Sequence, residues 1–422
     1  MAFTISFVSG HVLLEAVCCC VQLTFATILV DSGLRKMSGR DFSGCKYIYR
    51  MKTEDVMKSS TALLALTFSL GLIGCGGGTG SNPQKTQVTP TPSGQMQLEV
   101  LHPPAGGPTA DAVQTYLMTN TAAAGANFFV EWADVDQGPT ANPQYVWTSV
   151  DSAIQPWAAV GKKVNLIVWD VADATTNTST PTYVLNNLGP DNVTSGCNSG
   201  EVTPNYFSSA FQVPYKAFMQ QLIQYYGSNP AIGYIRFGLA QGGETYPNQG
   251  FDTDPDCSAA FTAWGWTPTS WINYLTSMLA YEVTLNSPKQ LMVGINTVNG
   301  DTSIPDQVAA FAVSKNIGFG SQGLQESDIQ AYDAGQPCTA DWCNLFNQYA
   351  GQVPLELQTA TQSDPTGGGV TGSLVTLLPF AAQRHADIME IYYQDWLTAY
   401  DPSYTVYDPA YATAFAEVAA PQ

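Results

Sequence analysis

The sequence is poor in basic residues. Its 422 residues include 15 Lys or Arg against 34 Asp or Glu, and the formal net charge at pH 7 is -19. Downstream of Gly74 there are eight basic residues against twenty-nine acidic ones. A chain this acidic repels polyanions, which argues against nucleic acid and anionic polymers as partners. Neutral ligands are therefore the expected class.

Motifs that hold cofactors or activate nucleophiles are also lacking. Leu101-His102-Pro103-Pro104 follows the first predicted strand, where a dinucleotide-binding fold has a glycine-rich loop. The sequence shows no Ser-His-Asp pattern and no cluster of metal ligands. We therefore expect neither a cofactor nor a metal.

Long hydrophobic runs are missing as well. The apolar run that ends at Cys75, in KSSTALLALTFSLGLIGC, is too short to favour a transmembrane helix. It resembles a bacterial lipoprotein signal peptide, and Leu72-Ile73-Gly74-Cys75 matches the lipobox. The resemblance implies cleavage before Cys75, lipidation of its thiol, and export to the bacterial cell envelope or surface. A plain membrane anchor is the alternative.

Four segments are expected along the chain. Residues 1–56 precede a signal that normally begins a protein, and we interpret them as a non-native upstream extension. Residues 57–74 are the predicted lipoprotein signal peptide. Residues 75–96, rich in Gly, Ser, Thr and Pro, are a predicted disordered tether. Residues 97–422 are the predicted globular domain, of a usual size for one barrel.

Four cysteines lie downstream of Cys75. An even number in an exported protein favours disulfides over a metal site. Cys338 and Cys343 are close enough in sequence to close one loop, whereas Cys197 and Cys257 follow the third and fourth predicted strands. Four cysteines allow three connectivities, so the pairing stays open. A zinc site is the alternative, but the usual paired C-x2-C spacing is absent.

Eight short apolar runs recur downstream of the tether, with helical segments between them. This alternation indicates a parallel sheet, and eight units predict a single α/β domain, a closed (β/α)8 (TIM) barrel with long βα loops. A doubly wound open sheet is the alternative. The predicted strands are residues 98–101, 128–132, 164–170, 232–239, 291–297, 317–322, 354–359 and 388–396. The predicted helices are residues 110–124, 150–160, 214–226, 271–285, 305–314, 341–350 and 372–384.

The stretch IGYIRFGLAQGGETYP, residues 232–247, passes from the fourth predicted strand into a loop with one carboxylate. Gly242 and Gly243 let the backbone approach a ligand closely just before Glu244. In a barrel the carboxyl ends of the strands form the active-site mouth, so Glu244 is predicted to lie there. A solvated acid in an ordinary βα loop is the alternative.

Alternation within the strands predicts which side chains point into the barrel. Arg236 on the fourth strand, Glu356 on the seventh and Glu390 on the eighth are predicted to face inward. A buried carboxylate is costly unless it is paired or used in catalysis, so both glutamates require a role.

An acid after the fourth strand and another on the seventh resemble the clan of retaining (β/α)8-barrel glycoside hydrolases, which includes cellulases, mannanases and β-galactosidases. Residues 128–169 are similar to the clan's unit from the second to the third strand. The matching positions are Trp132, Asp136 to Gly138, Tyr145 to Trp147, Asp151 and Gly161-Lys162.

The resemblance implies that Glu244 is the general acid/base and Glu356 the nucleophile of a two-carboxylate, retaining mechanism. Arg236 would keep Glu356 ionised, or would instead form an interior ion pair with Glu390 or Glu131. GLAQGGETYP also resembles the acid-bearing segment of β-amylases, which invert, so inversion is the alternative.

Two positions depart from the clan's pattern. The clan has an Asn before the acid/base that binds the sugar 2-hydroxyl, and this chain has Gly243 there. Asn296 and Gln322 are the candidate replacements. No tyrosine ends the sixth strand to orient a nucleophile, and Glu326 nearby is a reserve carboxylate.

Aromatic residues at strand ends are predicted to bind the sugar. A flat ring there can stack on a pyranose face, so Trp132, Trp169 and Trp396 are predicted subsite residues, with packing at the barrel top as the alternative. Tyr392, inward on the eighth strand, is added to the substrate-binding set, and His102 is a candidate hydrogen-bond partner of a hydroxyl.

We therefore expect a secreted, lipid-anchored, monomeric glycoside hydrolase that cleaves a neutral poly- or oligosaccharide. It would contact the membrane through lipidated Cys75 only. Because Gly243 departs from the clan, a non-catalytic carbohydrate-binding lipoprotein on the same barrel is the alternative.

Overall fold

The computed structural model describes residues 2–8, 11–18, 21–28, 95–104, 108–171, 179–197, 201–333, 341–366 and 369–420. The chain divides into two compact units, residues 1–80 and 81–422. In the first unit, β1 (Ala2–Val8), β2 (His11–Cys18) and β3 (Val21–Ile28) form an antiparallel sheet in that order. The predicted signal peptide, Cys75 and the tether up to residue 94 lie outside the described residues.

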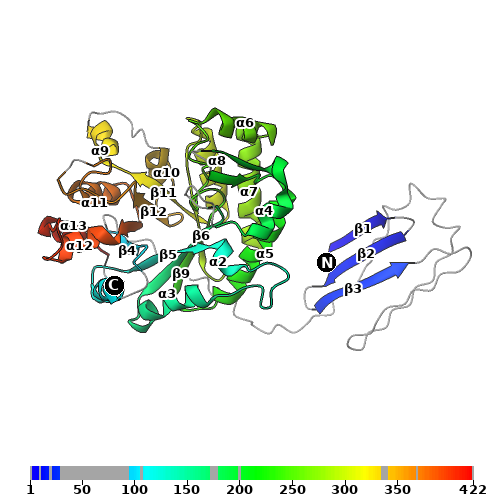
Figure 1. Ribbon diagram of the computed structural model, residues 1–422, viewed down its shortest axis with the longest axis horizontal. Helices are drawn as coiled ribbons and strands as arrows, with labels where there is room; N and C mark the ends of the chain where they lie inside the picture. The colour runs from blue at the N-terminus through cyan, green and yellow to red at the C-terminus, as the bar shows by residue number, and fades with distance from the viewer. Residues whose placement is uncertain are drawn as a thin grey trace, which may run out of the picture. The chain divides into compact units, whose positions relative to one another are not determined.

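Eight parallel strands of the second unit close into a barrel (Figure 1). Each strand pairs with the next along the chain, and the last pairs with the first. In order, the strands are β4 (Gln97–Leu101), β5 (Gly125–Glu131), β6 (Lys163–Trp169), β9 (Ile232–Phe237), β10 (Gln290–Gly294), β11 (Gly318–Leu324), β12 (Leu355–Thr359) and β13 (Ile388–Tyr392). The predicted TIM barrel is confirmed, and the open-sheet alternative is wrong.

Helices follow the strands and cover the outside of the barrel (Figure 1). They are α1 (Pro108–Thr119), α3 (Thr148–Ala159), α5 (Ser209–Tyr226), α7 (Pro268–Thr284), α8 (Ser303–Ser314), α10 (Asp341–Tyr349), α11 (Leu374–Gln383) and α13 (Pro409–Val418). All but α13 were predicted. Their starts follow local signals, since the Ser208 hydroxyl caps α5 and a capping box between Thr267 and Ser270 opens α7.

The loops at the carboxyl ends of the strands carry additional short elements. These are α2 (Trp132–Val135), α4 (Thr182–Leu188), η2 (Pro190–Asn192), β7 (Val193–Cys197), β8 (Glu201–Pro204), α6 (Pro255–Ala263), α9 (Glu326–Asp333) and α12 (Tyr393–Tyr400).

None of the helices in the described part of the chain combines the length and hydropathy that a membrane span requires.

A disulfide joins two of these loops. Cys197 at the end of β7 is bonded to Cys257 on α6, with an S–S distance of 2.01 Å, so two of the predicted disulfide cysteines pair. Cys343 on α10 is buried and disulfide-bonded, and Cys338 lies outside the described residues. The loops after β6 and β9 are therefore tied together beside the barrel mouth.

The predicted eighth strand extends too far. β13 ends at Tyr392, and α12 begins at the next residue. Trp396 and Ala399 both face the core from this helix, at the three-residue spacing of one helical face. Helical burial thus replaces strand alternation immediately after Tyr392.

The inside of the barrel is polar, in contrast to its outer shell. Apolar side chains of the strands and helices form one large hydrophobic core between the two layers. A small apolar group of Tyr234, Met292 and Ile388 fills part of the interior. The buried polar side chains that face inward are Glu99, Asn127, Asn165, Arg236, Glu356 and Glu390. This polar interior lies beneath the site described next.

Candidate active site

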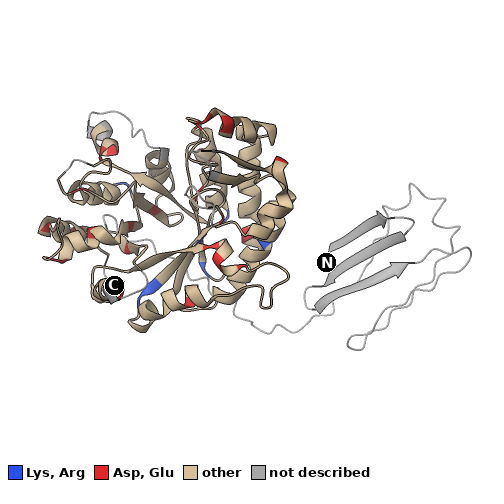
Figure 2. Ribbon diagram, viewed as in Figure 1, with Lys and Arg blue, Asp and Glu red and all other residues tan. Residues whose placement is uncertain are grey.

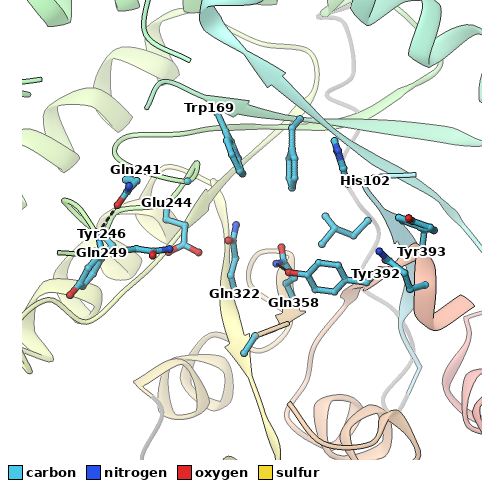
Figure 3. A pocket seen from close by; sticks show the side chains of 15 residues that line it. His102, Trp169, Gln241, Glu244, Tyr246, Gln249, Gln322, Gln358, Tyr392 and Tyr393 are labelled. Atoms are coloured by element: carbon cyan, nitrogen blue, oxygen red, sulfur yellow. Dashed lines mark hydrogen bonds between the residues drawn. The ribbon is translucent and has the colours of Figure 1, made fainter. Parts of the chain in front are cut away.

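A cavity of about 400 Å³ lies at the carboxyl ends of the barrel strands (Figure 3). Residues from the ends of β4, β5, β6, β11, β12 and β13 and from the loop after β9 form its walls. They are Leu101, His102, Phe129, Trp169, Gln241, Gly242, Glu244, Tyr246, Gln249, Gln322, Gln358, Ala360, Tyr392, Tyr393 and Gln394. Glu244 thus lies at the mouth, as predicted.

The loop conformation before Glu244 depends on two glycines. Gly242 and Gly243 have φ values of +69° and +75°, which residues with side chains rarely adopt. A Cβ atom on Gly243 would lie 2.7 Å from Cδ1 of Trp169. An asparagine before Glu244, as the clan has, therefore does not fit this loop, which explains the departure at Gly243.

Amide side chains from the next two strands contact Glu244 instead. Asn296 Nδ2 donates to Glu244 Oε2 at 2.5 Å. With its amide oriented to satisfy both neighbours, Gln322 donates to Glu244 Oε1 and accepts from Arg236 Nη2 at 2.8 Å. Both residues predicted as replacements for the missing asparagine therefore lie against Glu244.

A second cavity, of about 440 Å³, also has Glu244 in its lining. The two cavities share Glu244, Tyr246 and Gln322 in their linings. Asn296 and Asp328 line the second cavity only. Glu244 therefore borders both cavities.

Stacked aromatic rings form one wall of the first cavity. Trp169 stacks on Phe129 with ring centroids 4.6 Å apart, and Phe129 stacks on His102 at 4.7 Å. Figure 3 shows Trp169 and His102 along the same side of the cavity. Trp169 and His102 were predicted from the sequence, and such a row of rings suits the apolar face of a sugar.

Amides and phenols make up much of the remaining wall. Five glutamines, at positions 241, 249, 322, 358 and 394, line the first cavity with Tyr246, Tyr392 and Tyr393. Among the described residues of this lining there is no Lys or Arg. Amide groups both donate and accept hydrogen bonds, so the wall matches neutral hydroxyl-bearing ligands better than anions.

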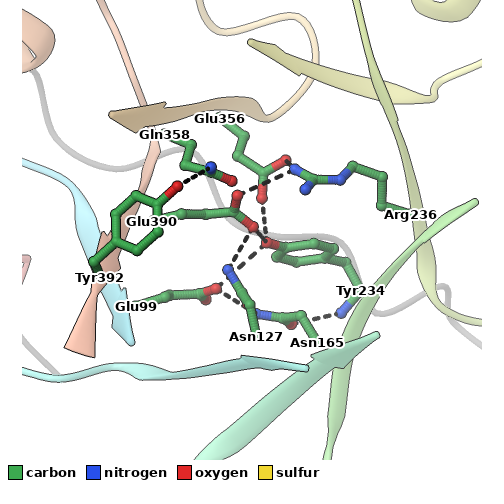
Figure 4. Close-up of polar contacts among 9 residues, drawn as sticks. All are labelled: Glu99, Asn127, Asn165, Tyr234, Arg236, Glu356, Gln358, Glu390 and Tyr392. Carbon is green, nitrogen blue, oxygen red and sulfur yellow. Dashed lines mark hydrogen bonds and ion pairs between the residues drawn. The ribbon is translucent and has the colours of Figure 1, made fainter. Parts of the chain in front are cut away.

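Beneath the mouth, three carboxyl groups surround the Tyr234 hydroxyl, and Arg236 pairs with two of them (Figure 4). Arg236 Nη1 lies 2.5 Å from Glu356 Oε2 and 3.3 Å from Glu390 Oε2. The Tyr234 hydroxyl donates to Glu356 and also lies 3.2 Å from Glu390 Oε1 and 3.4 Å from Glu99 Oε2. The interior ion pair of Arg236 with Glu390, one of the two predicted alternatives, is present.

Asparagines from two strands complete this interior network. Asn127 Nδ2 donates to Glu390 Oε1 at 2.6 Å, and Asn165 Nδ2 donates to Glu99 and to Asn127 Oδ1. Each of the three carboxyl groups therefore has hydrogen-bond partners despite complete or nearly complete burial.

Burial controls the protonation of this network. It raises the pKa of Glu99 to about 8, and the nearby Glu356 carboxylate adds to the effect. Burial also raises the pKa of Glu390 well above its usual value, although Arg236 opposes this. Burial disfavours the charge on Arg236, but Glu356 and Glu390 together raise its pKa. The Arg236 cation thus pairs with Glu356 and Glu390, and burial favours the protonated forms of Glu99 and Glu390.

The predicted convergence of Glu244 and Glu356 over one hollow is wrong. Glu356 is 0% exposed and is absent from the linings of both cavities. Gln358, two residues further along the same face of β12, lines the first cavity instead. Gln322 and Arg236 connect Glu244 to Glu356, so the two acids are linked through side chains and do not face one space.

Two predicted sugar platforms are also corrected. Trp132 is fully buried on α2, where its Nε1 donates to Asp136 and its ring packs on Phe218. Trp396 is fully buried on α12 with its ring centroid 4.7 Å from that of Phe415. Neither ring lines a cavity described above, because each follows the point where its strand turns into a helix.

The other predicted residues divide between mouth and interior. Tyr392, Gln322 and Trp169 line the first cavity and Asn296 the second, whereas Arg236 is 1% exposed inside the barrel. Glu326, the reserve carboxylate, begins α9 and lines neither cavity. Among the described residues, no three His, Cys, Asp or Glu side chains are arranged to hold a metal ion.

Sequence reasoning missed several lining residues, namely Phe129, Gln241, Tyr246, Gln249, Gln358, Tyr393 and Gln394. Two of them carried a usable signal. Phe129 lies two residues after Asn127 on β5, and Gln358 lies two residues after Glu356 on β12. Each therefore points inward, like the earlier residue, but nearer the carboxyl end of its strand. Gln241, Tyr246 and Gln249 lie on the loop after β9, and Tyr393 and Gln394 lie on α12, so strand alternation does not apply to any of them.

Comparison with solved structures returns barrel glycoside hydrolases. A β-galactosidase from the psychrophilic Marinomonas ef1 is 11% identical, with a TM-score of 0.43, covering 76% of this chain and 58% of that one. An endo-β-1,4-xylanase from Gloeophyllum trabeum is 12% identical, with a TM-score of 0.44, covering 81% and 99%. A family 10 glycoside hydrolase from Paenibacillus barcinonensis is 12% identical, with a TM-score of 0.43, covering 78% and 97%.

No protein-family model matches the chain, and no curated protein matches it. The chain spans 58% of the length of the Marinomonas β-galactosidase. The barrel assignment therefore rests on the order and pairing of the chain's own eight strands.

Replacing Arg236 by Met is expected to lower the free energy of unfolding by about 3–5 kcal/mol, because it leaves buried carboxyl groups without their cation. Urea denaturation measures the change. Arg384→Met is the matched control, since this partly exposed arginine lies over the Phe380 ring and should cost about 1 kcal/mol or less. Equal losses in the two variants would contradict the role of Arg236.

Stability is expected to fall as the pH rises from about 5 to 8. In the folded state Glu99 keeps its proton up to a pKa of about 8, whereas in the unfolded chain it loses the proton near 4.5. The folded state thus binds the extra proton in this window, and its advantage is lost as pH rises. Melting temperatures measured across this range test the effect.

Glu99→Gln should flatten this pH dependence, because an amide mimics the protonated carboxyl. Glu417→Gln, a change at an exposed acid on α13, serves as the control and should keep the wild-type slope. A Glu99→Gln variant with the wild-type slope would show that Glu99 is not the titrating group.

Proposed function

We propose that this barrel hydrolyses O-glycosidic bonds of a neutral oligo- or polysaccharide, with Glu244 as the general acid/base. The observation that carries the proposal is that Glu244 lines two cavities, beside aromatic and amide walls. Aromatic rings stack on sugars and amides bond their hydroxyls, so a bound glycan would bring a glycosidic oxygen to this carboxyl.

The surroundings of Glu244 suit proton transfer. Its two oxygens accept hydrogen bonds from the side-chain amides of Asn296 and Gln322. Both of these donors are neutral, and they fix the orientation of the carboxyl group. A positioned carboxyl of this kind protonates a leaving oxygen and later removes a proton from water. Gln322 also bonds Arg236, which anchors the mouth to the polar interior.

The two-carboxylate, retaining mechanism implied by the resemblance requires a second carboxylate that reaches the anomeric carbon. Glu356 has the expected strand but lies beneath the mouth, paired with Arg236. For Glu356 to act as the nucleophile, the layer of Gln322 and Gln358 above it would have to open.

Sugar binding without catalysis is the second candidate function. The burial of Glu356 and the presence of Gln358 in the first cavity favour it, because an amide at this position cannot attack an anomeric carbon. The aromatic wall and the amides would serve a binding protein equally well.

We also propose that the chain is exported and lipid-anchored at Cys75, and that it acts as a monomer. The lipobox-like Leu72-Ile73-Gly74-Cys75 supports the anchor. Metabolic labelling with a palmitate analogue, compared between the wild type and Cys75→Ser, tests it.

Glu244→Gln is expected to lower kcat on the best aryl glycoside or polysaccharide of a panel by about 10²–10⁴-fold, because it removes the proton donor. Glycan binding, measured by calorimetry, should be retained. Glu326→Gln, at an acid that lines neither cavity, is the matched control and should keep wild-type activity. A wild-type protein that binds glycans but hydrolyses none would establish the binding function instead.

A further inference from the structure

The first cavity is short of nucleophiles. Among the described residues of its lining, Glu244 is the single carboxylate. Retention needs two groups at the anomeric carbon, one to give a proton to the leaving oxygen and one to attack. If Glu244 supplies the proton, the attacking group must come from elsewhere.

Four other carboxyl groups described above, those of Glu99, Glu356, Glu390 and Asp328, are already engaged. Glu99, Glu356 and Glu390 are buried inside the barrel. Their carboxyl groups are held in the network of Asn127, Tyr234 and Arg236. Asp328 lines the second cavity, but its Oδ2 accepts from the backbone N–H of Gln325 at 3.1 Å and thus fixes the first turn of α9. None of the four offers a free carboxylate to the first cavity.

Gln358 presents an unused acceptor at this cavity. The residue is 6% exposed, and its Nε2 donates to the Tyr392 hydroxyl at 3.3 Å. Its Oε1 is buried and has no hydrogen-bond partner among the described residues. A buried acceptor without a partner is unfavourable, so this oxygen is set to receive a donor from a ligand. Figure 3 shows Gln358 and Tyr392 next to each other in the cavity.

We propose that the substrate is a β-linked 2-acetamido-2-deoxy sugar, that its own acetamido oxygen is the nucleophile, and that Gln358 Oε1 accepts the acetamido N–H. The inference rests on the proposed glycosidase function. The substrate supplies the group that the cavity lacks, and Gln358 orients it.

Several features of the cavity match this group. The acetamide is neutral, as the lining without Lys or Arg requires, and it carries an N–H for Gln358. Its methyl group needs an apolar surface, and Leu101, Phe129 and Ala360 line the same cavity. The β linkage follows from geometry, because in a gluco- or galacto-configured sugar the acetamido oxygen attacks C1 opposite the leaving oxygen only when that oxygen is β.

The reaction balances without another reagent. In the first step the acetamido oxygen forms a bond to C1 while the bond from C1 to the leaving oxygen breaks, and that oxygen takes the proton of Glu244. The product is an oxazolinium ion whose N–H is held by Gln358. In the second step Glu244 takes a proton from water, the water oxygen bonds to C1, and the bond from C1 to the acetamido oxygen breaks. The acetamide is restored and configuration is retained.

Substrate comparison is the first test. The full chain is assayed with 4-methylumbelliferyl β-glycosides of N-acetylglucosamine and N-acetylgalactosamine, and with the glucose and galactose counterparts. We expect kcat/KM at least about 100-fold higher for the 2-acetamido sugars. Successive fluorination of the acetyl group should lower kcat stepwise, because fluorine weakens the attacking oxygen. Equal turnover of 2-hydroxy sugars, or no effect of fluorination, would overturn the inference and leave the glycosidase function standing.

Substitution of Gln358 is the second test. Gln358→Met keeps the side-chain volume but removes the acceptor, and should lower kcat/KM on 2-acetamido substrates by about 10- to 100-fold. Gln358→Glu keeps an acceptor and should recover activity to within about tenfold of the wild type. Gln348→Met, on the exposed side of α10, is the matched control, and circular dichroism confirms folding of each variant.

The outcomes separate the two proposals. An unchanged kcat/KM in folded Gln358→Met overturns the role of Gln358. A wild-type protein that cleaves no glycoside of either class overturns the proposed function, and the inference with it.

Discussion

A single buried arginine organises the interior of this barrel. Arg236 is 1% exposed and bonds Glu356, Glu390 and Gln322, which belong to three different strands. A cation so deep in a protein is stable only with carboxylate partners, and the carboxyl groups in turn need the cation. Basic residues are rare throughout the barrel, as Figure 2 shows, and within the described part of the chain Arg236 is the cation that pairs with Glu356 and Glu390. The arrangement keeps Glu356 in the interior and leaves the mouth to amides and aromatic rings.

The fold was predictable because its signals are local. Strands buried on both faces appear as short apolar runs, and helices between them show the longer period, so eight units could be counted from the sequence. The end of the eighth strand was not predictable in this way. Tryptophan is common in strands, so Trp396 fits a strand by residue type. The chain nevertheless turns into α12 at Tyr393, because the helix buries Trp396 against Phe415. Only contacts distant in sequence decide between the two.

The candidate site was predictable in part, for the same reason. Asn296 and Gln322 could be named as partners of Glu244 because the carboxyl ends of consecutive parallel strands meet at one mouth. Alternation also placed Glu356 correctly inside the barrel. Alternation could not give the position of Glu356 along the barrel axis, because this position depends on the register between strands. In β12, Glu356 pairs with Gly320 on one side and with Ile388 on the other. That register puts Gln358, and not Glu356, at the cavity.

The two polar layers of the barrel differ in how far they are satisfied. In the interior the carboxyl groups of Glu99, Glu356 and Glu390 all have hydrogen-bond partners, and Arg236 Nε is the one buried polar side-chain atom of this network without a partner among the described residues. At the mouth, Trp169 Nε1, Gln358 Oε1 and Gln394 Oε1 have none among the described residues, although all three are buried atoms of the cavity wall. Unpaired polar atoms are tolerated where a ligand pairs them, since the free energy lost in the empty site returns on binding. One donor and two acceptors near a single carboxylate match a ligand that carries both kinds of group, as the neutral, amide-bearing sugar proposed above does.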